Sequence, residues 1–131
     1  MKSPELRHSV SPKRVLVAED EPWVANTIQM ALTVDGHTVE IAQDGEQALS
    51  MFCAGEYDLV ITDFKMPMMD GLELAEAVKK LSPQKPVILV TAYLERITTG
   101  MGKVSNVDVL LPKPFSITEL QAAIAKLFPP C

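Results

Sequence analysis

Cysteine and histidine are scarce in this chain of 131 residues, which contains two of each. Cys53 and Cys131 are far apart, and none of the four residues has the spacing of a zinc site or of a CxxC redox pair. A reducing compartment is therefore expected, with Cys53 as a small core or partly buried residue. We expect His8 and His37 to be exposed and to have no function.

Long apolar runs and positive charge are also lacking. No stretch approaches the ~20 apolar residues that span a membrane, and residues 1–14 contain no apolar region typical of an export signal. The formal charge of −5 disfavours nucleic acid and anionic lipid as partners, because both are polyanions. We expect a soluble, cytoplasmic protein that binds no nucleic acid directly and no membrane.

Apolar residues are plentiful at 47%, so a chain of this length can bury one core. Residues 1–12 have little to bury and are expected to form a disordered N-terminal arm. One domain is predicted at 13–128, followed by a short tail at 129–131. The sequence contains no apparent internal repeat or second domain.

Short apolar runs alternate with amphipathic segments along the predicted domain. The runs at 14–19, 58–63 and 87–91 are almost continuously apolar, which is typical of strands covered on both faces. Residues 37–42 alternate between apolar and polar side chains, so we expect this strand at an edge of the sheet. A fifth strand is predicted at 107–111.

Helices are predicted between and after these strands. Their starts are marked by a proline at a first helical position or by a capping box: Pro22; Asp44 with Gln47; Asp70 with Glu73; and Ser116 with Glu119. The apolar stripes expected to face the sheet are Val24, Ile28 and Leu32; Leu74, Ala77, Val78 and Leu81; and Ile117, Leu120, Ile124 and Leu127. A further helix at 94–103 would contain two threonines and two glycines, so we expect it to be short, distorted or mobile.

This alternation of strands and helices predicts an α/β fold, an open and doubly wound sheet of five parallel strands in the order 2-1-3-4-5. Ligands of such sheets bind outside the carboxyl ends of the strands. The polar residues expected at those ends are Glu19, Asp20 and Glu21, Asp63, Thr91, and Lys113. Crowded carboxylates are stable only if one is protonated or a cation lies between them, and oxygen ligands of this kind suit Mg²⁺.

A carboxylate beside Mg²⁺ can act as a nucleophile toward phosphorus and hold the phosphoryl group as an aspartyl phosphate. The ion, the Lys113 ammonium and the Thr91 hydroxyl would share the charge of that group. Taken singly, each residue has an ordinary explanation: Asp63 could end a strand at a turn, and Glu21 is expected to cap the helix at Pro22. Their convergence favours phosphoryl chemistry.

Four segments in this order and spacing carry a resemblance to a known family. They read VLVAEDEP at 15–22, DLVITDFKMPMMDG at 58–71, VTA at 90–92 and LPKPF at 111–115. Over its whole predicted domain the chain resembles the receiver domains of two-component response regulators. The resemblance implies a flavodoxin-like (βα)5 fold and a signalling domain that catalyses only its own phosphorylation and dephosphorylation.

The resemblance also implies roles for individual residues. Asp63 would be the phosphoacceptor and a metal ligand, Asp20 would bind Mg²⁺ directly, and Glu19 would bind it through water. The backbone carbonyl of Lys65 would complete the protein ligands.

Thr91 and Lys113 would engage the phosphoryl group, and the bond between Lys113 and Pro114 would be cis. The donor would be a sensor histidine kinase or a histidine phosphotransfer protein. The chain would then signal by docking to a downstream protein, as a monomer or weak dimer.

Two positions depart from the family pattern. The family usually has Asp where Glu19 stands, and the extra methylene can alter metal affinity. It usually has an aromatic residue three positions before the lysine, where this chain has Leu110. This departure favours an alternative in which the chain is an interaction module that keeps the fold but switches little.

A third possibility is an enzyme on a similar sheet. A phosphatase of the haloacid dehalogenase type wants a second Asp two residues after the first, where this chain has Lys65. A flavodoxin needs a phosphate loop rich in Ser, Thr and Gly after its first strand, where this chain has acids that would repel phosphate.

Overall fold

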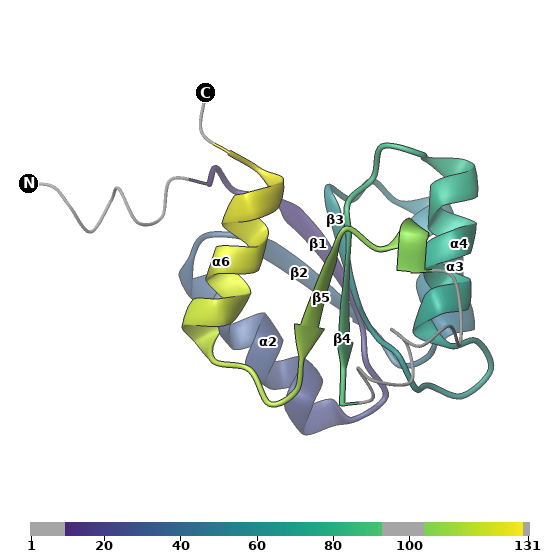
Figure 1. Ribbon diagram of the computed structural model, residues 1–131, viewed down its shortest axis with the longest axis horizontal. Helices are drawn as coiled ribbons and strands as arrows, with labels where there is room; N and C mark the ends of the chain where they lie inside the picture. Colours follow the sequence, from purple (N-terminus) through teal and green to yellow (C-terminus); the bar gives the residue numbers. More distant parts are fainter. Residues whose placement is uncertain (1–9, 93–103, 130–131) are drawn as a thin grey trace, which may run out of the picture.

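A computed structural model of the chain describes residues 10–92 and 104–129 (Figure 1). The elements in chain order are β1 (Arg14–Ala18), α2 (Pro22–Val34), β2 (Thr38–Ala42), α3 (Gly45–Ala54), β3 (Leu59–Asp63), α4 (Gly71–Leu81), β4 (Val87–Thr91), the 3-10 helix η2 (Val104–Asn106), β5 (Val109–Pro112) and α6 (Ile117–Leu127). The helix expected at 94–103 lies outside the described residues. Among the described residues, no helix is long and apolar enough to cross a membrane.

The five strands form one parallel sheet in the order β2-β1-β3-β4-β5, which confirms the predicted fold. Helices α2 and α6 cover one face of this sheet, and α3 and α4 cover the other (Figure 1). Val15 is paired with Val39 on one side and with Leu59 on the other. Because β1 and β3 are parallel neighbours, their carboxyl ends lie side by side.

Coverage on both faces explains the nearly continuous apolar runs. Val17 and Ile61 pack with the helices on one side, whereas Leu16 and Val60 pack with those on the other. Every residue of β3 and of β4 is buried. A strand in this position has no wet face, so it shows no alternation of polar and apolar side chains.

His37, which directly precedes the edge strand β2, is buried, whereas the sequence analysis expected it to be exposed. Its Nδ1 accepts a hydrogen bond of 2.9 Å from the backbone N–H of Lys13. Burial lowers the pKa of His37 below its ordinary value, because the charged imidazolium loses its water. The histidine is therefore part of the packing that joins the start of β1 to the turn before β2.

Both capping boxes predicted for the last two helices are present. Asp70 and Glu73 exchange side chain to backbone hydrogen bonds at the start of α4, and Ser116 and Glu119 do the same at the start of α6. Pro22 is the first residue of α2, as predicted.

The capping box predicted at the start of α3 is only half formed. Asp44 accepts a hydrogen bond of 2.7 Å from the backbone N–H of Gln47. The Gln47 side chain, however, accepts from the backbone N–H of Gln43 rather than from that of Asp44. Asp44 thus caps the helix alone.

Three other side chains that were predicted to be buried are exposed. Leu81 is the last residue of α4 and Ile117 is the first of α6, and they are 58% and 52% exposed. As terminal residues they have no further helical turn on one side to cover them. Cys53 lies in α3 and is also exposed.

Met68, in the loop between β3 and α4, has a left-handed backbone with φ of 75°. This conformation is unfavourable for a side chain with a Cβ, and Met68 is 70% exposed, so packing offers little in return. We expect Met68→Gly to raise the free energy of unfolding by roughly 0.5 kcal/mol, measured by urea titration in EDTA.

Met30 supplies the matched control, because it is 71% exposed but lies within α2. Met30→Gly is expected to lower the free energy of unfolding by about 1 kcal/mol. If both substitutions destabilised the protein equally, Met68 would carry no backbone strain.

Candidate metal centre

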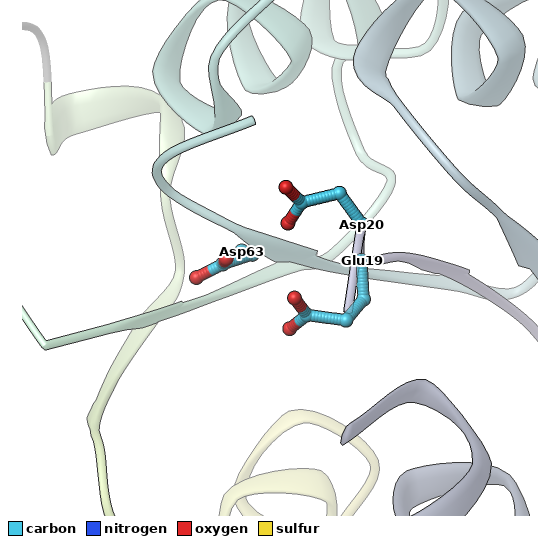
Figure 2. Close-up of side chains that lie close together, drawn as sticks. All are labelled: Glu19, Asp20 and Asp63. Atoms are coloured by element: carbon cyan, nitrogen blue, oxygen red, sulfur yellow. The ribbon is translucent and has the colours of Figure 1, made fainter. Parts of the chain in front are cut away.

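Three carboxylates gather at the carboxyl end of the sheet. Glu19 and Asp20 directly follow β1, and Asp63 is the last residue of the neighbouring strand β3. One oxygen of each lies within 4.8 Å of the others (Figure 2). Glu19 and Asp63 are buried, whereas Asp20 is exposed. The arrangement presents oxygen ligands from two adjacent strand ends to one point.

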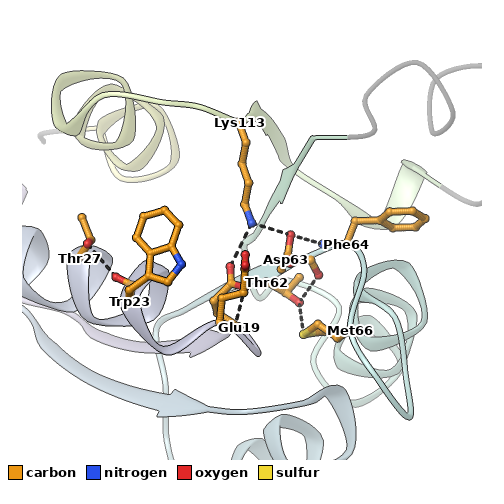
Figure 3. A network of polar contacts seen from close by, with 9 residues as sticks. Glu19, Trp23, Thr27, Thr62, Asp63, Phe64, Met66 and Lys113 are labelled. Carbon is orange, nitrogen blue, oxygen red and sulfur yellow. Dashed lines mark hydrogen bonds and ion pairs between the residues drawn. The ribbon is translucent and has the colours of Figure 1, made fainter.

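Lys113 reaches the two buried carboxylates from the segment after β5. Its Nζ lies 3.3 Å from Glu19 Oε1 and 3.2 Å from Asp63 Oδ1 (Figure 3). The peptide bond between Lys113 and Pro114 is cis. The single ammonium faces more than one carboxylate, so the cluster keeps an excess of negative charge that a cation can neutralise.

Backbone N–H groups fix both buried carboxylates. Glu19 Oε2 accepts a hydrogen bond of 3.2 Å from the N–H of Glu21, and Asp63 Oδ1 accepts one of 3.0 Å from the N–H of Phe64. Glu21 occupies the N-cap position of α2, as expected, but its side chain makes no capping hydrogen bond. The local turn after each strand therefore orients the carboxylate of that strand.

The electrostatics of the cluster follow from burial and from charge repulsion. Burial, and then the charge of Asp63, raise the pKa of Glu19 to about 7. Burial likewise raises the pKa of Asp63 above its usual range. Burial alone would lower the pKa of Lys113, but the charges of Asp63 and Glu19 outweigh it and raise that pKa. Near neutral pH, Glu19 therefore exists in both its protonated and its charged form.

An open pocket of about 550 Å³ lies above the cluster, and its walls include Asp20, Asp63, Lys65 and Lys113. Thr91 is the last residue of β4 and is fully buried, and its carbonyl accepts a hydrogen bond of 2.9 Å from the N–H of Lys113. Every residue that the sequence analysis assigned to the site therefore lies at the carboxyl end of the sheet.

The sequence analysis missed two residues that shape the site, Gly71 and Thr62, because their contacts form only in the folded chain. A Cβ added to Gly71 would lie 2.2 Å from the carbonyl oxygen of Asp63, so only glycine lets α4 begin this close to the end of β3. Thr62 donates from Oγ1 to the carbonyl oxygen of Asp63 at 2.9 Å, and the same Oγ1 lies 3.9 Å from Met66 Sδ in the following loop. The Asp70-Gly71 pair marks a turn in the sequence but not this close approach.

The model of one protein family, described as the response regulator receiver domain, matches residues 15–125. The chain belongs to the response regulator receiver family. A receiver domain of a response regulator is a signalling domain.

The amino-acid sequence of this receiver domain is similar to parts of longer regulatory proteins. It is 37% identical over 120 residues to the transcriptional regulatory protein TrcR of Mycobacterium tuberculosis, which covers 89% of this chain and 46% of that protein. It is 34% identical over 116 residues to the response regulator MprA of Mycolicibacterium vanbaalenii, covering 88% and 50%. The chain thus spans about half the length of these relatives.

Solved receiver structures resemble this one closely. Response regulator TrrA of Thermotoga maritima, determined in complex with Mg²⁺-BeF, is 35% identical with a TM-score of 0.82, covering 88% of this chain and 99% of that one. Chemotaxis response regulator CheY4 of Vibrio cholerae is 27% identical with a TM-score of 0.81, covering 90% and 100%.

The raised pKa of Glu19 predicts that Glu19→Gln stabilises the metal-free receiver domain. The pKa of the Glu19 carboxyl rises from 4.5 in the unfolded chain to about 7 in the folded protein. The free energy of unfolding therefore falls progressively as the pH rises through that interval. Glutamine removes the charge but still offers an oxygen to Lys113. In EDTA at pH 8 we expect a gain of roughly 1–3 kcal/mol in the free energy of unfolding, measured by urea titration.

At pH 5 Glu19 is mostly protonated in the folded state, so the same substitution should then have little effect. Glu21→Gln removes a neighbouring charge that is exposed, and it serves as the control. Equal gains from Glu19→Gln at both pH values would contradict the assigned electrostatics.

Proposed function

We propose that this receiver domain accepts a phosphoryl group on Asp63, with Mg²⁺ bound by the acidic cluster, and that it signals through phosphorylation-dependent docking to another protein. The observation that carries the proposal is the meeting of Glu19, Asp20 and Asp63 within 4.8 Å, with Lys113 Nζ 3.2 Å from Asp63. A buried nucleophile, a cation site and a fixed ammonium are the parts that such a transfer requires.

The donor set fits Mg²⁺ because it consists of oxygen atoms and carries excess negative charge. Asp20 and Asp63 would bind the ion directly, Glu19 would bind it through water, and the carbonyl of Lys65 would complete the protein ligands. When bound, the ion would neutralise charge on the phosphoryl oxygens. TrrA, a similar receiver, was determined in complex with Mg²⁺-BeF, which supports this assignment.

The chain's own residues would supply the rest of the chemistry. An Asp63 carboxylate oxygen forms the new bond to phosphorus as the bond between phosphorus and the donor's histidine nitrogen breaks, and the released imidazole takes up a proton. Lys113 already touches Asp63 Oδ1, so its ammonium can pass to a phosphoryl oxygen without a large movement. Thr91 would donate its hydroxyl to another of those oxygens.

The donor in this proposal is a phosphohistidine on a sensor kinase or on a histidine phosphotransfer protein in the cytoplasm. The domain acts on no other substrate, and it catalyses only its own phosphorylation and dephosphorylation. With a net charge of −5 it would contact its output partner rather than nucleic acid, as a monomer or weak dimer. The domain would comprise residues 13–128, between an arm at 1–12 and a tail at 129–131.

A second candidate is an interaction module that switches little, and Leu110 is the observation that favours it. Leu110 packs beside Leu72 and Leu89, at the position where the family usually has an aromatic ring. A domain of this kind would take up no phosphoryl group from a small donor, whereas the first proposal requires uptake.

Asp63→Asn is expected to abolish phosphorylation, because an amide is not a nucleophile toward phosphorus. The measurement is intact mass and Phos-tag mobility after incubation with acetyl phosphate and Mg²⁺. Asp58→Asn is the control, since Asp58 is an exposed acid just before the opposite end of the same strand, β3. An acid-labile adduct of unchanged yield in Asp63→Asn would refute the assignment.

Mg²⁺ binding should strengthen as the pH rises from 6 to 8, because the ion competes with the proton on Glu19, whose pKa is about 7. We expect the Kd to fall by up to about tenfold over this interval. Trp23 is a convenient reporter, since it lines a pocket together with Lys113 (Figure 3). In Glu19→Gln the dependence on pH should be much flatter, and an unchanged slope would exclude Glu19 as the competing group.

A further inference from the structure

The loop between β3 and α4, residues 64–70, carries the Lys65 carbonyl that the proposed function assigns to Mg²⁺. The two ends of this loop are anchored beside the acceptor. The N–H of Gly71 donates a hydrogen bond of 2.7 Å to the carbonyl of Phe64, and Met66 is buried with its Sδ 3.9 Å from Thr62 Oγ1. These contacts set where the loop leaves the strand and where it enters α4.

Met69, near the α4 end of the same loop, lies against Gly45, the first residue of α3. A Cβ added to Gly45 would lie 2.3 Å from the carbonyl oxygen of Met69 and 2.6 Å from its Cβ. Ordinary contact begins near 3.4 Å, so the loop backbone would have to move by about 1 Å to admit a methyl group. No side-chain rotation relieves the contact, because the nearest atom belongs to the backbone.

The start of α3 is less able to move than the loop. Asp44 caps it through the N–H of Gln47, and Ala48 and Phe52 fix the helix in the core. Met66 and Met69 of the loop pack against the same core, but the loop backbone is irregular and includes the left-handed residue Met68. A side chain at position 45 would therefore displace the loop rather than the helix.

We infer that Gly45 is a positioning residue for the metal centre: the absence of a side chain lets the 64–70 loop lie close enough to α3 for the Lys65 carbonyl to reach Mg²⁺. This inference rests on the proposed function. Mg²⁺ demands nearly ideal octahedral geometry with short bonds, so a shift of about 1 Å in one ligand weakens binding strongly. Gly45 touches no ligand itself and acts through Met69.

The test is Gly45→Ala. We expect the Kd for Mg²⁺, followed by Trp23 fluorescence, to rise by about tenfold, which is the size of effect seen when groups that support metal ligands are altered. In EDTA, apart from the direct neighbours of residue 45, backbone amide chemical shifts should change mainly at residues 64–70. The second measurement needs no metal and reports the loop directly.

Two control variants separate positioning from loss of stability. Gly55→Ala adds the same methyl group at the other end of α3, where it would meet the Tyr57 ring at 3.1 Å rather than the loop. Asp44→Ala removes the cap of α3 without adding an atom toward Met69. Both should leave the Kd for Mg²⁺ within about twofold of the wild-type value, although Asp44→Ala lowers stability by about 1 kcal/mol.

An unchanged Kd in Gly45→Ala, or an equal rise in Asp44→Ala, would overturn the inference. If Gly45→Ala fails to fold, Met69→Gly is compared with the double variant that carries both Met69→Gly and Gly45→Ala. Glycine at position 69 removes the Cβ that the alanine would meet at 2.6 Å and gives the loop backbone more freedom to move. A threefold or greater loss of Mg²⁺ affinity on adding the alanine then supports the inference, and equal affinity overturns it. Failure of the proposed function is distinguishable, because the wild-type domain would then bind no Mg²⁺ or take up no phosphoryl group.

Discussion

The burial of Glu19 and Asp63 side by side, at the ends of two adjacent parallel strands, is the constraint on which the site depends. Both carboxylates are buried, so water screens their charges poorly, and the pKa of each is raised. Lys113 offsets part of this charge from a third strand end. The remainder of the negative charge favours the binding of a proton or of a cation.

The sheet makes this costly arrangement possible because it holds the strand ends rigidly. Every residue of β3 and β4 is buried, and helices pack on both faces, so Asp63 cannot retreat from Glu19. The backbone N–H groups of Glu21 and Phe64 orient the two carboxylates further. Free energy gained in the core thus maintains a cluster that is unfavourable by itself.

Close backbone packing has a comparable role on the far side of the site. Gly71 lets α4 begin against the carbonyl of Asp63, and Gly45 lets α3 begin against that of Met69. The loop that follows β3 is held between these two helix starts.

The sequence by itself determined the five strands, their order and the residues that meet at the carboxyl ends, because doubly buried strands and capped helices leave local patterns that can be read without coordinates. It did not determine the burial of His37, the exposure of Leu81, Ile117 and Cys53, or the close approaches at Gly45 and Gly71. Those features depend on which elements become neighbours. Distances of this kind between segments far apart in the chain arise only in the tertiary structure, where packing decides how near two backbones can come.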